Sequence, residues 1–383
     1  MVGMPASSTS TESRWAAVAA LGQSVWYDNV ARPALADGHL AQLIDRDRVT
    51  GGTSNPSIFA KAVLDSDVYD DVLRAAPTSD SDAQVFERVW IEDIQRACDL
   101  VRPVWDRTGG RDGYISIEEE AEFAFEVEPA VTRAHELRAL VDRPNLMVKV
   151  PGTEAGVEVF RRLTRQGLNI NMTLLFSRER YRQIAEGYVA ALGERLDAGE
   201  DVSTIASVAS FFVSRIDVQA DRRLPEDSPL RGRIAVANAK LAYADVFLTT
   251  HSGPAWERLA AAGAAPQRPL WASTGGKNPA YSPTLYIDGL IGERTVTTVP
   301  DATLDAFRDA AEPAPDHVTV LEGLDRARDD LAALAEAGVD LDEITSDLER
   351  DGVQQFADAY GEMLEAIGRK RERIAAAPGT PPQ

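Results

Sequence analysis

The sequence predicts an α/β protein, specifically a (β/α)8 TIM barrel with additional C-terminal helices. Short apolar runs of strand length alternate with amphipathic helical stretches along most of the 383 residues, and there are eight such runs. Strands that alternate with helices favour a parallel sheet, and eight of them favour a closed barrel. The alternative is an open doubly wound sheet, which usually has fewer strands and a glycine-rich phosphate turn after the first strand. No G-x-G-x-x-G follows any expected strand, so we prefer the barrel.

The elements follow in a regular order. The expected strands lie near residues 24–29, 49–53, 114–118, 146–150, 169–175, 205–212, 270–273 and 295–299. The expected helical stretches include 82–108, 129–142, 154–166, 178–198, 230–262 and 301–310. Two more helical patterns with charged outer faces, 320–337 and 341–374, follow the last strand and are expected to pack against the barrel.

We expect one domain over residues 21–374, which holds the barrel and the C-terminal helices. Residues 1–20 are expected to be a flexible N-terminal segment, and the Ala/Pro-rich residues 375–383 a frayed tail. Residues 1–13 lack the positively charged segment and apolar core of a secretory signal. No apolar run approaches the roughly 18 residues of a membrane span. These observations predict a cytoplasmic protein.

The net charge of −21 argues against a general nucleic-acid or anionic-membrane surface, since both would repel the chain. An anionic ligand must therefore meet a locally basic pocket. The one cysteine, Cys98, excludes an intramolecular disulfide, fits a reducing compartment and is expected to be a small buried hydrophobe. The four histidines show no metal-ligand spacing, so no metal is expected; they are His39, His135, His251 and His317.

Lys149 is the most informative single residue. Only five of the 40 basic residues are lysines, and this one lies between Met147, Val148 and Val150 on an expected strand. Poor hydration there disfavours the charged ammonium and favours a nucleophilic amine, the chemistry of a Schiff-base lysine. The alternative is a lysine at a strand end whose head reaches out to solvent.

Further polar residues lie where expected strands end, which is where a barrel builds its active site. They are Asp28, Asn55, Glu118, Asn171, Thr173, Ser210 and Arg215. Asn171 and Thr173 are two residues apart, so both point to the same face of their strand. A lysine, two carboxylates, amides and a guanidinium are together suited to aldol chemistry on a sugar phosphate. Taken singly, each residue has a structural alternative: a helix cap, a turn or a satisfied polar group in the core.

Several motifs resemble the longer subfamily of the transaldolases from about residue 24 to 300, with weaker similarity beyond. They are GGTSNPSIFAKA (51–62), GYISIE (113–118), NLMVKVPGTEAG (145–156), NINMTLLFS (169–177), ASFFVSRID (209–217) and WASTGGKNPAYSPTLYIDGLIGERTVTTVP (271–300). The resemblance implies transfer of a dihydroxyacetone unit from a ketose phosphate to an aldose phosphate. The donor would be sedoheptulose 7-phosphate or fructose 6-phosphate, and the acceptor glyceraldehyde 3-phosphate or erythrose 4-phosphate. It also implies the pentose phosphate pathway and no metal or organic cofactor. We expect a monomer or homodimer.

The resemblance also implies a role for each site residue. Lys149 would form the Schiff base, Asp28 would act as acid and base at the cleaved bond, and Glu118 would shuttle protons through water together with Thr173. Substrate contacts would come from Asn55 and Asn171 to the dihydroxyacetone hydroxyls, and from Ser210, Arg215 and Ser273 to the phosphate.

The chain departs from the family pattern in two places. Gly275 occupies a position where shorter members have a phosphate-binding arginine, and Lys277 is the nearest substitute. Glu118 is followed by Glu119 and Glu120, where relatives usually continue with valine and an Asp-Pro or Ser-Pro pair. We expect these extra acids on a solvated loop; pointing inward, they would raise the pKa of Glu118.

Two other functions remain open. Related sugar-phosphate aldolases release the dihydroxyacetone unit instead of transferring it, but they are shorter and carry a tyrosine where this chain has Phe212. A non-catalytic sugar-phosphate sensor would need neither a nucleophilic lysine nor a pair of carboxylates. The segment Gly275-Gly276-Lys277 is not a Walker motif, since the required earlier glycine falls at Trp271.

Overall fold

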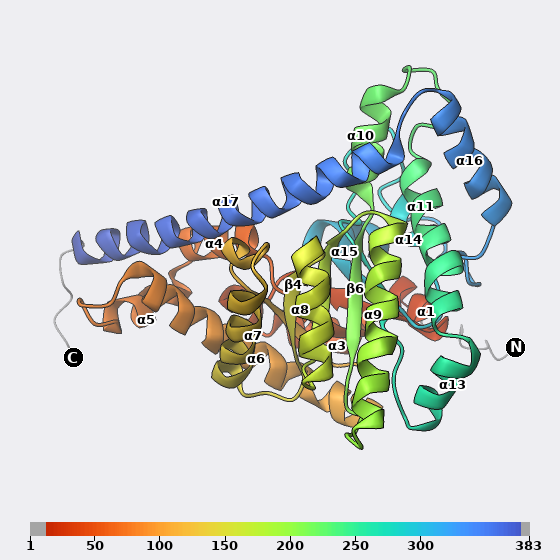
Figure 1. Ribbon diagram of the computed structural model, residues 1–383. Helices are drawn as coiled ribbons and strands as arrows, with labels where there is room; N and C mark the ends of the chain where they lie inside the picture. The colour runs from red at the N-terminus through yellow and green to blue at the C-terminus, as the bar shows by residue number, and fades with distance from the viewer. Residues whose placement is uncertain (1–12, 377–383) are drawn as a thin grey trace, which may run out of the picture.

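The computed structural model describes residues 13–376 and contains one closed barrel. Its eight strands pair in parallel, each with the next along the chain, and β8 closes the ring by pairing with β1 (Figure 1). The strands are β1 (Gln23–Tyr27), β2 (Val49–Thr53), β3 (Ile115–Glu118), β4 (Leu146–Pro151), β5 (Ile170–Leu175), β6 (Ser207–Phe212), β7 (Arg268–Ala272) and β8 (Thr295–Val299). The predicted (β/α)8 barrel is confirmed.

Helices surround the barrel and connect its strands. The longer ones are α3 (His39–Asp47), α4 (Pro56–Asp65), α6 (Asp82–Thr108), α7 (Val127–Val141), α8 (Glu154–Arg165), α9 (Arg178–Asp197), α10 (Ser214–Arg223), α11 (Ile234–Ala242), α13 (Gly253–Ala261) and α15 (Asp301–Arg308). The shorter ones are α2 (Arg32–Ala36), η1 (Asp67–Tyr69), α5 (Asp70–Ala75), η2 (Ala121–Phe123), α12 (Leu248–Thr250) and α14 (Leu285–Asp288). Strands β4, β5 and β6 are buried along their whole length, because side chains fill the interior and helices cover the outside.

One expected helix is interrupted. The stretch 230–262 was expected to be a single amphipathic helix, but α11 passes into a π-helix, η3 (Tyr243–Phe247), and then into the short α12. The helix ends with His251 as its C-cap, and α13 begins at Gly253. His251 is buried: its Nδ1 lies 2.9 Å from the Phe247 carbonyl, and its Nε2 accepts from the Gln267 N–H.

Register places the chemistry-bearing residues of three neighbouring strands in one row. Glu118 on β3 is the register partner of Lys149 on β4, and Lys149 is the partner of Asn171 on β5. Partners in a parallel sheet point to the same side, so all three side chains enter the barrel interior.

Glycine at position 51 is required by close packing inside the barrel. A Cβ there would lie 2.6 Å from the Tyr114 carbonyl oxygen and 2.7 Å from the indole of Trp26. Trp26 therefore occupies the space that a side chain at position 51 would need, and this explains the first of the two adjacent glycines in β2.

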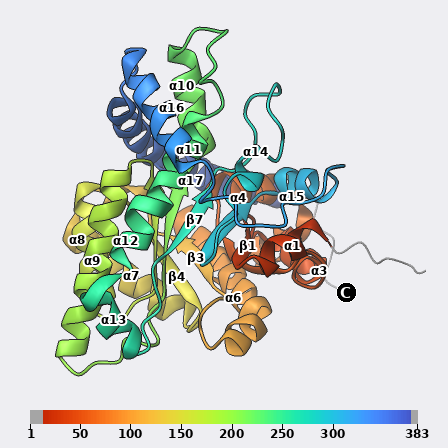
Figure 2. The same ribbon diagram turned by 90° about the vertical axis from the view of Figure 1, so that its right-hand side faces the viewer.

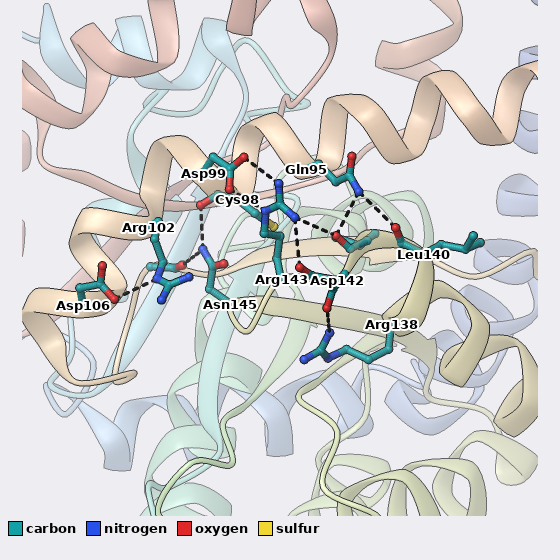
Figure 3. A network of polar contacts seen from close by, with 12 residues as sticks. Gln95, Cys98, Asp99, Arg102, Asp106, Arg138, Leu140, Asp142, Arg143 and Asn145 are labelled. Carbon is teal, nitrogen blue, oxygen red and sulfur yellow. Dashed lines mark hydrogen bonds and ion pairs between the residues drawn. The ribbon is translucent and has the colours of Figure 1, made fainter.

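A polar network joins α6 to the loop before β4 (Figure 3). The buried Asn145 amide donates to the carbonyls of Cys98 and Gly113, and Arg143 forms an ion pair with Asp99. Cys98 itself is fully buried, as expected for a small hydrophobe. The network fixes the start of β4, the strand that carries Lys149.

The N-terminal segment is more ordered than the sequence indicated. Residues 1–20 were expected to be flexible, yet Arg14–Ala20 form helix α1, and residues 1–12 lie outside the described part of the chain. Trp15 is fully buried against Phe307 of α15, and its indole N–H donates to the Leu304 carbonyl. An aromatic anchor of this size holds the helix to the barrel.

The two C-terminal helices are α16 (Leu324–Glu336) and α17 (Leu341–Ala376). Helix α17 runs as one long rod across one end of the barrel and packs on α4, α5, α6 and α10 (Figures 1 and 2). That end carries the carboxyl ends of the strands, because α17 side chains line the same cleft as Lys149 and Asp28. Of the expected tail, 375–383, the structure describes only residues 375 and 376. Within 13–376, no helix is long and apolar enough to cross a membrane.

Candidate active site

Lys149 lies deep in the barrel and is only 7% exposed. Its Nζ donates to Glu118 Oε1 at 2.8 Å and to the Ser54 carbonyl oxygen at 2.9 Å. The alternative of a solvated lysine head is therefore wrong. A buried amine next to a carboxylate has a proton acceptor within hydrogen-bond distance, which a nucleophilic lysine requires.

Asp28 follows β1 and faces the same space. Thr53 Oγ1 donates to Asp28 Oδ1 at 2.6 Å, and Asn55 Nδ2 donates to Oδ2 at 3.3 Å. Thr53 also shares a hydrogen bond of 2.7 Å with Thr298 of β8. Burial raises the pKa of Asp28, while the nearby Lys149 charge and the two hydrogen bonds oppose the rise. A carboxyl group whose pKa is raised in this way is a better proton acceptor than an ordinary aspartate, as a general base requires.

Glu118 is the second carboxyl group beside the lysine. Burial raises its pKa, the Lys149 charge and hydrogen bond oppose the rise, and the Asp28 charge adds to it. Two carboxyl groups thus act on one lysine, Glu118 through a direct hydrogen bond and Asp28 through its charge.

Asn55 has two functions in one side chain. Its Oδ1 accepts from the Ile58 N–H and caps the N-terminus of α4, where Pro56 occupies the first helical turn. Its Nδ2 is thereby aimed at Asp28. The sequence alternative of a turn residue before Pro56 is compatible with this arrangement, because the cap itself orients the amide.

Asn171, Ser210 and Ser116 form a buried chain of hydrogen bonds. Ser210 Oγ donates to Asn171 Oδ1 at 2.6 Å, and Asn171 Nδ2 donates to Ser116 Oγ at 3.0 Å. Ser210 was expected on the phosphate side of the site. The structure brings it to Asn171, in the row that contains Lys149, because successive strands put both residues into the barrel interior.

Thr173 lines the cleft two residues after Asn171 on β5. The residue after it, Leu174, has φ +59°, a left-handed conformation that a leucine rarely adopts, and the register of β5 with β6 shifts at this point. Such a conformation costs of order 1–2 kcal/mol and persists only where packing imposes it. It turns the Leu174 side chain towards α17, where a Cβ on Gly352 would lie 2.9 Å from it.

The opposite end of the cleft is basic and rich in hydroxyls. Arg215, at the start of α10, extends over the ring of Phe212 with 5.4 Å between guanidinium carbon and ring centre. Ser273 has φ +55°, and its hydroxyl lies 3.0 Å from that of Ser214. Lys277 lies in the exposed loop after β7 and lines the same cleft. Ser214 is fully buried and was not anticipated from the sequence.

These residues line one cleft of about 330 Å³, a volume suited to a small metabolite. Its lining includes Asp28, Asn55, Glu118, Lys149, Thr173, Ser210, Arg215, Ser273 and Lys277. Asn171, fully buried, supports it from behind. Three lining residues that the sequence analysis did not single out come from α17: Gln355, Phe356 and Ala359.

Glu119 and Glu120 do not lie on a solvated loop. Glu119 is 6% exposed, and neither of its carboxyl oxygens has a hydrogen-bond partner among residues 13–376. Burial, followed by the Glu120 charge, raises its pKa well above the ordinary value. Glu120 pairs with Arg133 at 2.6 Å. The expectation failed because helices α6, α7 and α17 cover this side of β3 and form a small cavity of about 30 Å³.

No group of three or more His, Cys, Asp or Glu side chains in residues 13–376 is arranged to hold a metal ion.

Comparison with known proteins supports the same chemistry. A family model described as Transaldolase/Fructose-6-phosphate aldolase matches residues 25–367. The transaldolase of Thiobacillus denitrificans is 45% identical over 357 residues, which cover 92% of this chain and 98% of the relative. The chain belongs to this family. The transaldolases of Thermobifida fusca and Frankia alni are 43% and 41% identical and cover 91% and 93% of the chain, and 96% and 97% of their own lengths.

Family membership confirms the resemblance seen in the motifs and the predicted enzyme class, one that transfers aldehyde or ketone residues. The match also extends beyond residue 300, through α16 and most of α17.

Proposed function

We propose that the protein transfers a dihydroxyacetone unit between sugar phosphates through a Schiff base on Lys149, as a transaldolase of the pentose phosphate pathway. The donor is sedoheptulose 7-phosphate or fructose 6-phosphate, and the acceptor is glyceraldehyde 3-phosphate or erythrose 4-phosphate. One observation carries the proposal: Lys149 Nζ is held against Glu118 in a cleft that also contains Asp28.

The first step is imine formation. Glu118 takes a proton from the Lys149 ammonium across 2.8 Å, and the free amine attacks the ketone carbon of the donor. The carbonyl oxygen leaves as water after receiving two protons, with Glu118 and Thr173 relaying them. The product is an iminium ion that can accept an electron pair.

The second step breaks a carbon–carbon bond. Asp28 removes the proton from the hydroxyl at C4, the C3–C4 bond breaks, and its electron pair moves into the iminium ion to give an enamine. The aldose phosphate leaves. The acceptor aldehyde then adds to the enamine carbon, Asp28 returns the proton to the new alkoxide, and water hydrolyses the imine. All steps are proton transfers, additions and the reverse eliminations, with no net oxidation or reduction, so they need neither a metal nor an organic cofactor.

The polar walls of the cleft hold the substrate. We assign Asn55, Asn171 and Ser210 to the dihydroxyacetone hydroxyls, because Ser210 bonds to Asn171 in the row of Lys149. Arg215, Ser273 and Lys277 are assigned to the phosphate at the basic end of the cleft. A guanidinium can bind two phosphate oxygens at once, whereas a lysine supplies a point charge.

Transfer is favoured over simple cleavage by Phe212, which lines the cleft and has no hydroxyl to protonate the enamine. We further propose a cytoplasmic enzyme with one domain, in which α1 joins the barrel and C-terminal helices of residues 21–374, acting as a monomer or homodimer without nucleic-acid or membrane partners.

The test is a coupled assay for transfer from fructose 6-phosphate to erythrose 4-phosphate, combined with borohydride trapping on fructose 6-phosphate. We expect transfer, and a reduced dihydroxyacetone unit on one lysine. Release of free dihydroxyacetone at the same rate without an acceptor would instead establish cleavage. Absence of both turnover and trapping would leave only sugar-phosphate binding.

A further inference from the structure

The guanidinium of Arg215 is unusual in this acidic protein because it has no carboxylate partner. No ion pair involves Arg215 among residues 13–376, although the chain has 61 acidic residues and Arg223 of α10 and Arg350 of α17 both pair with Asp347. Burial lowers its pKa. Its one side-chain hydrogen bond within these residues runs from Nη1 to Gln355 Oε1 of α17, at 2.9 Å.

The helix backbone at Gln355 is held in place by the packing of α17 on the barrel, while the Gln355 side chain itself is exposed. Gly352, three residues earlier and on the same face, forms the notch that receives Leu174. Phe356 and Ala359 continue this face along the cleft. The face of α17 that meets β5 therefore also meets Arg215, so the helix fixes the amide relative to the row that contains Lys149.

A neutral amide is chemically distinct from the acids that populate this helix. Asp347 and Asp351 precede Gln355 on α17, and Asp358 follows it. A carboxylate at position 355 would pair with Arg215 and compete with a phosphate for its charge. An amide oxygen accepts one N–H and leaves both the positive charge and the remaining donors free.

We propose that Gln355 is a positioning and specificity-determining residue, which orients the Arg215 guanidinium towards the substrate phosphate without neutralising it. Helix α17 thereby sets the preference for phosphorylated over unphosphorylated donors. The inference rests on the proposed function, in which Arg215 binds the phosphate.

The test compares Gln355→Ala, Gln355→Glu and the control Gln354→Ala in the full-length enzyme. Gln354 is exposed and bonds to Asp358 within the same helix, so it matches Gln355 in type and surroundings without reaching Arg215. Steady-state constants are measured with fructose 6-phosphate and with free dihydroxyacetone as donors, and inorganic phosphate serves as a competitive inhibitor.

We expect Gln355→Ala to raise KM for fructose 6-phosphate about 3- to 10-fold, the effect of one lost hydrogen bond, with kcat nearly unchanged. Gln355→Glu should raise it further and weaken phosphate inhibition in parallel. Neither variant should change KM for free dihydroxyacetone, and Gln354→Ala should behave like the wild type.

Equal effects on both donors, or no effect of either Gln355 variant, would overturn the inference. Arg215→Ala separates this failure from failure of the phosphate assignment. If Arg215→Ala selectively impairs the phosphorylated donor while the Gln355 variants do not, only the role of Gln355 is wrong. If Arg215→Ala affects both donors equally, the phosphate assignment itself fails. In the double variant Arg215→Ala/Gln355→Ala, the second change should add nothing, because the two residues act through one contact.

Discussion

The Glu118 carboxylate and the Lys149 ammonium lie 2.8 Å apart because their Cα atoms are register partners on β3 and β4. Neither side chain depends on a loop for its position. Strand register is fixed by the backbone ladder of the closed barrel, so the distance between nucleophile and proton acceptor is set by the pairing of two neighbouring strands.

Lys149→Arg is expected to abolish activity while leaving the protein folded. A guanidinium stays protonated and cannot attack a carbonyl, yet it can still pair with Glu118. Trapping with fructose 6-phosphate and borohydride, followed by peptide mass spectrometry, should give no label in this variant. The control Lys277→Arg should keep the label. Label on Lys61 or Lys240 of the wild type would contradict the assignment.

Asp28→Asn is expected to lower kcat by about 10²–10⁴-fold, the range for a lost general acid or base. Imine formation precedes the step that Asp28 serves, so borohydride should still label Lys149 in this variant. Thr53→Ser keeps the hydroxyl that bonds to Asp28 and should lose little activity. Wild-type turnover in Asp28→Asn would reject the role.

Lys277→Ala is expected to raise KM for phosphorylated donors, but less than Arg215→Ala does. Lys277 lies exposed in its loop and supplies a point charge, whereas Arg215 supplies a fork of donors. The comparison uses fructose 6-phosphate and free dihydroxyacetone, with the exposed Lys61→Ala as a control for loss of a surface charge. If Lys277→Ala affects both donors alike, the residue shapes the loop instead of binding phosphate.

Glu119→Gln is expected to stabilise the protein increasingly as the pH rises. The folded state raises the pKa of Glu119 above the ordinary 4.5, so its contribution is fully present below about pH 4.5 and is lost as the pH rises through the folded-state pKa. In that window the wild type loses up to about 1.4 kcal/mol per pH unit from this group.

Urea unfolding between pH 5 and 9 measures the free energy of unfolding of the wild type and of Glu119→Gln. The difference between the two free energies should grow with pH, with the variant the more stable. The exposed Glu122→Gln corrects for the loss of one charge. A difference that stays constant across this range would show that Glu119 is ionised in the folded state at all these pH values.

The barrel could be predicted from the sequence because each strand is a short apolar run bounded by helices with clear amphipathic periodicity. The interruption of the helix within 230–262 could not be predicted. Helical periodicity continues through Tyr243–Phe247, and a π-helix changes the hydrogen-bond pattern without changing the composition.

Most of the candidate site could be predicted because the carboxyl ends of the strands converge at one end of a barrel. Asp28, Glu118, Lys149 and Arg215 could therefore be assigned to one site from their positions near strand ends, before any contact between them was known. Gln355 could not be located. A polar residue on a long amphipathic helix looks the same whether it faces water or a guanidinium. Glu119 was misplaced for a related reason: strand alternation shows which side of β3 it leaves from, but not that α17 covers that side.

Because α17 lies over the cleft, two separate parts of the chain contribute to the site. Bond making and breaking depend on the barrel strands, whose residues are fixed by register, while the face presented by Gln355, Phe356 and Ala359 comes from α17, after the last strand. If Gln355 acts as proposed, we expect substitutions on that face to change which sugar is accepted and to leave the reacting groups where they are. A search for variants that accept altered donors should therefore begin with single substitutions on the inner face of this helix.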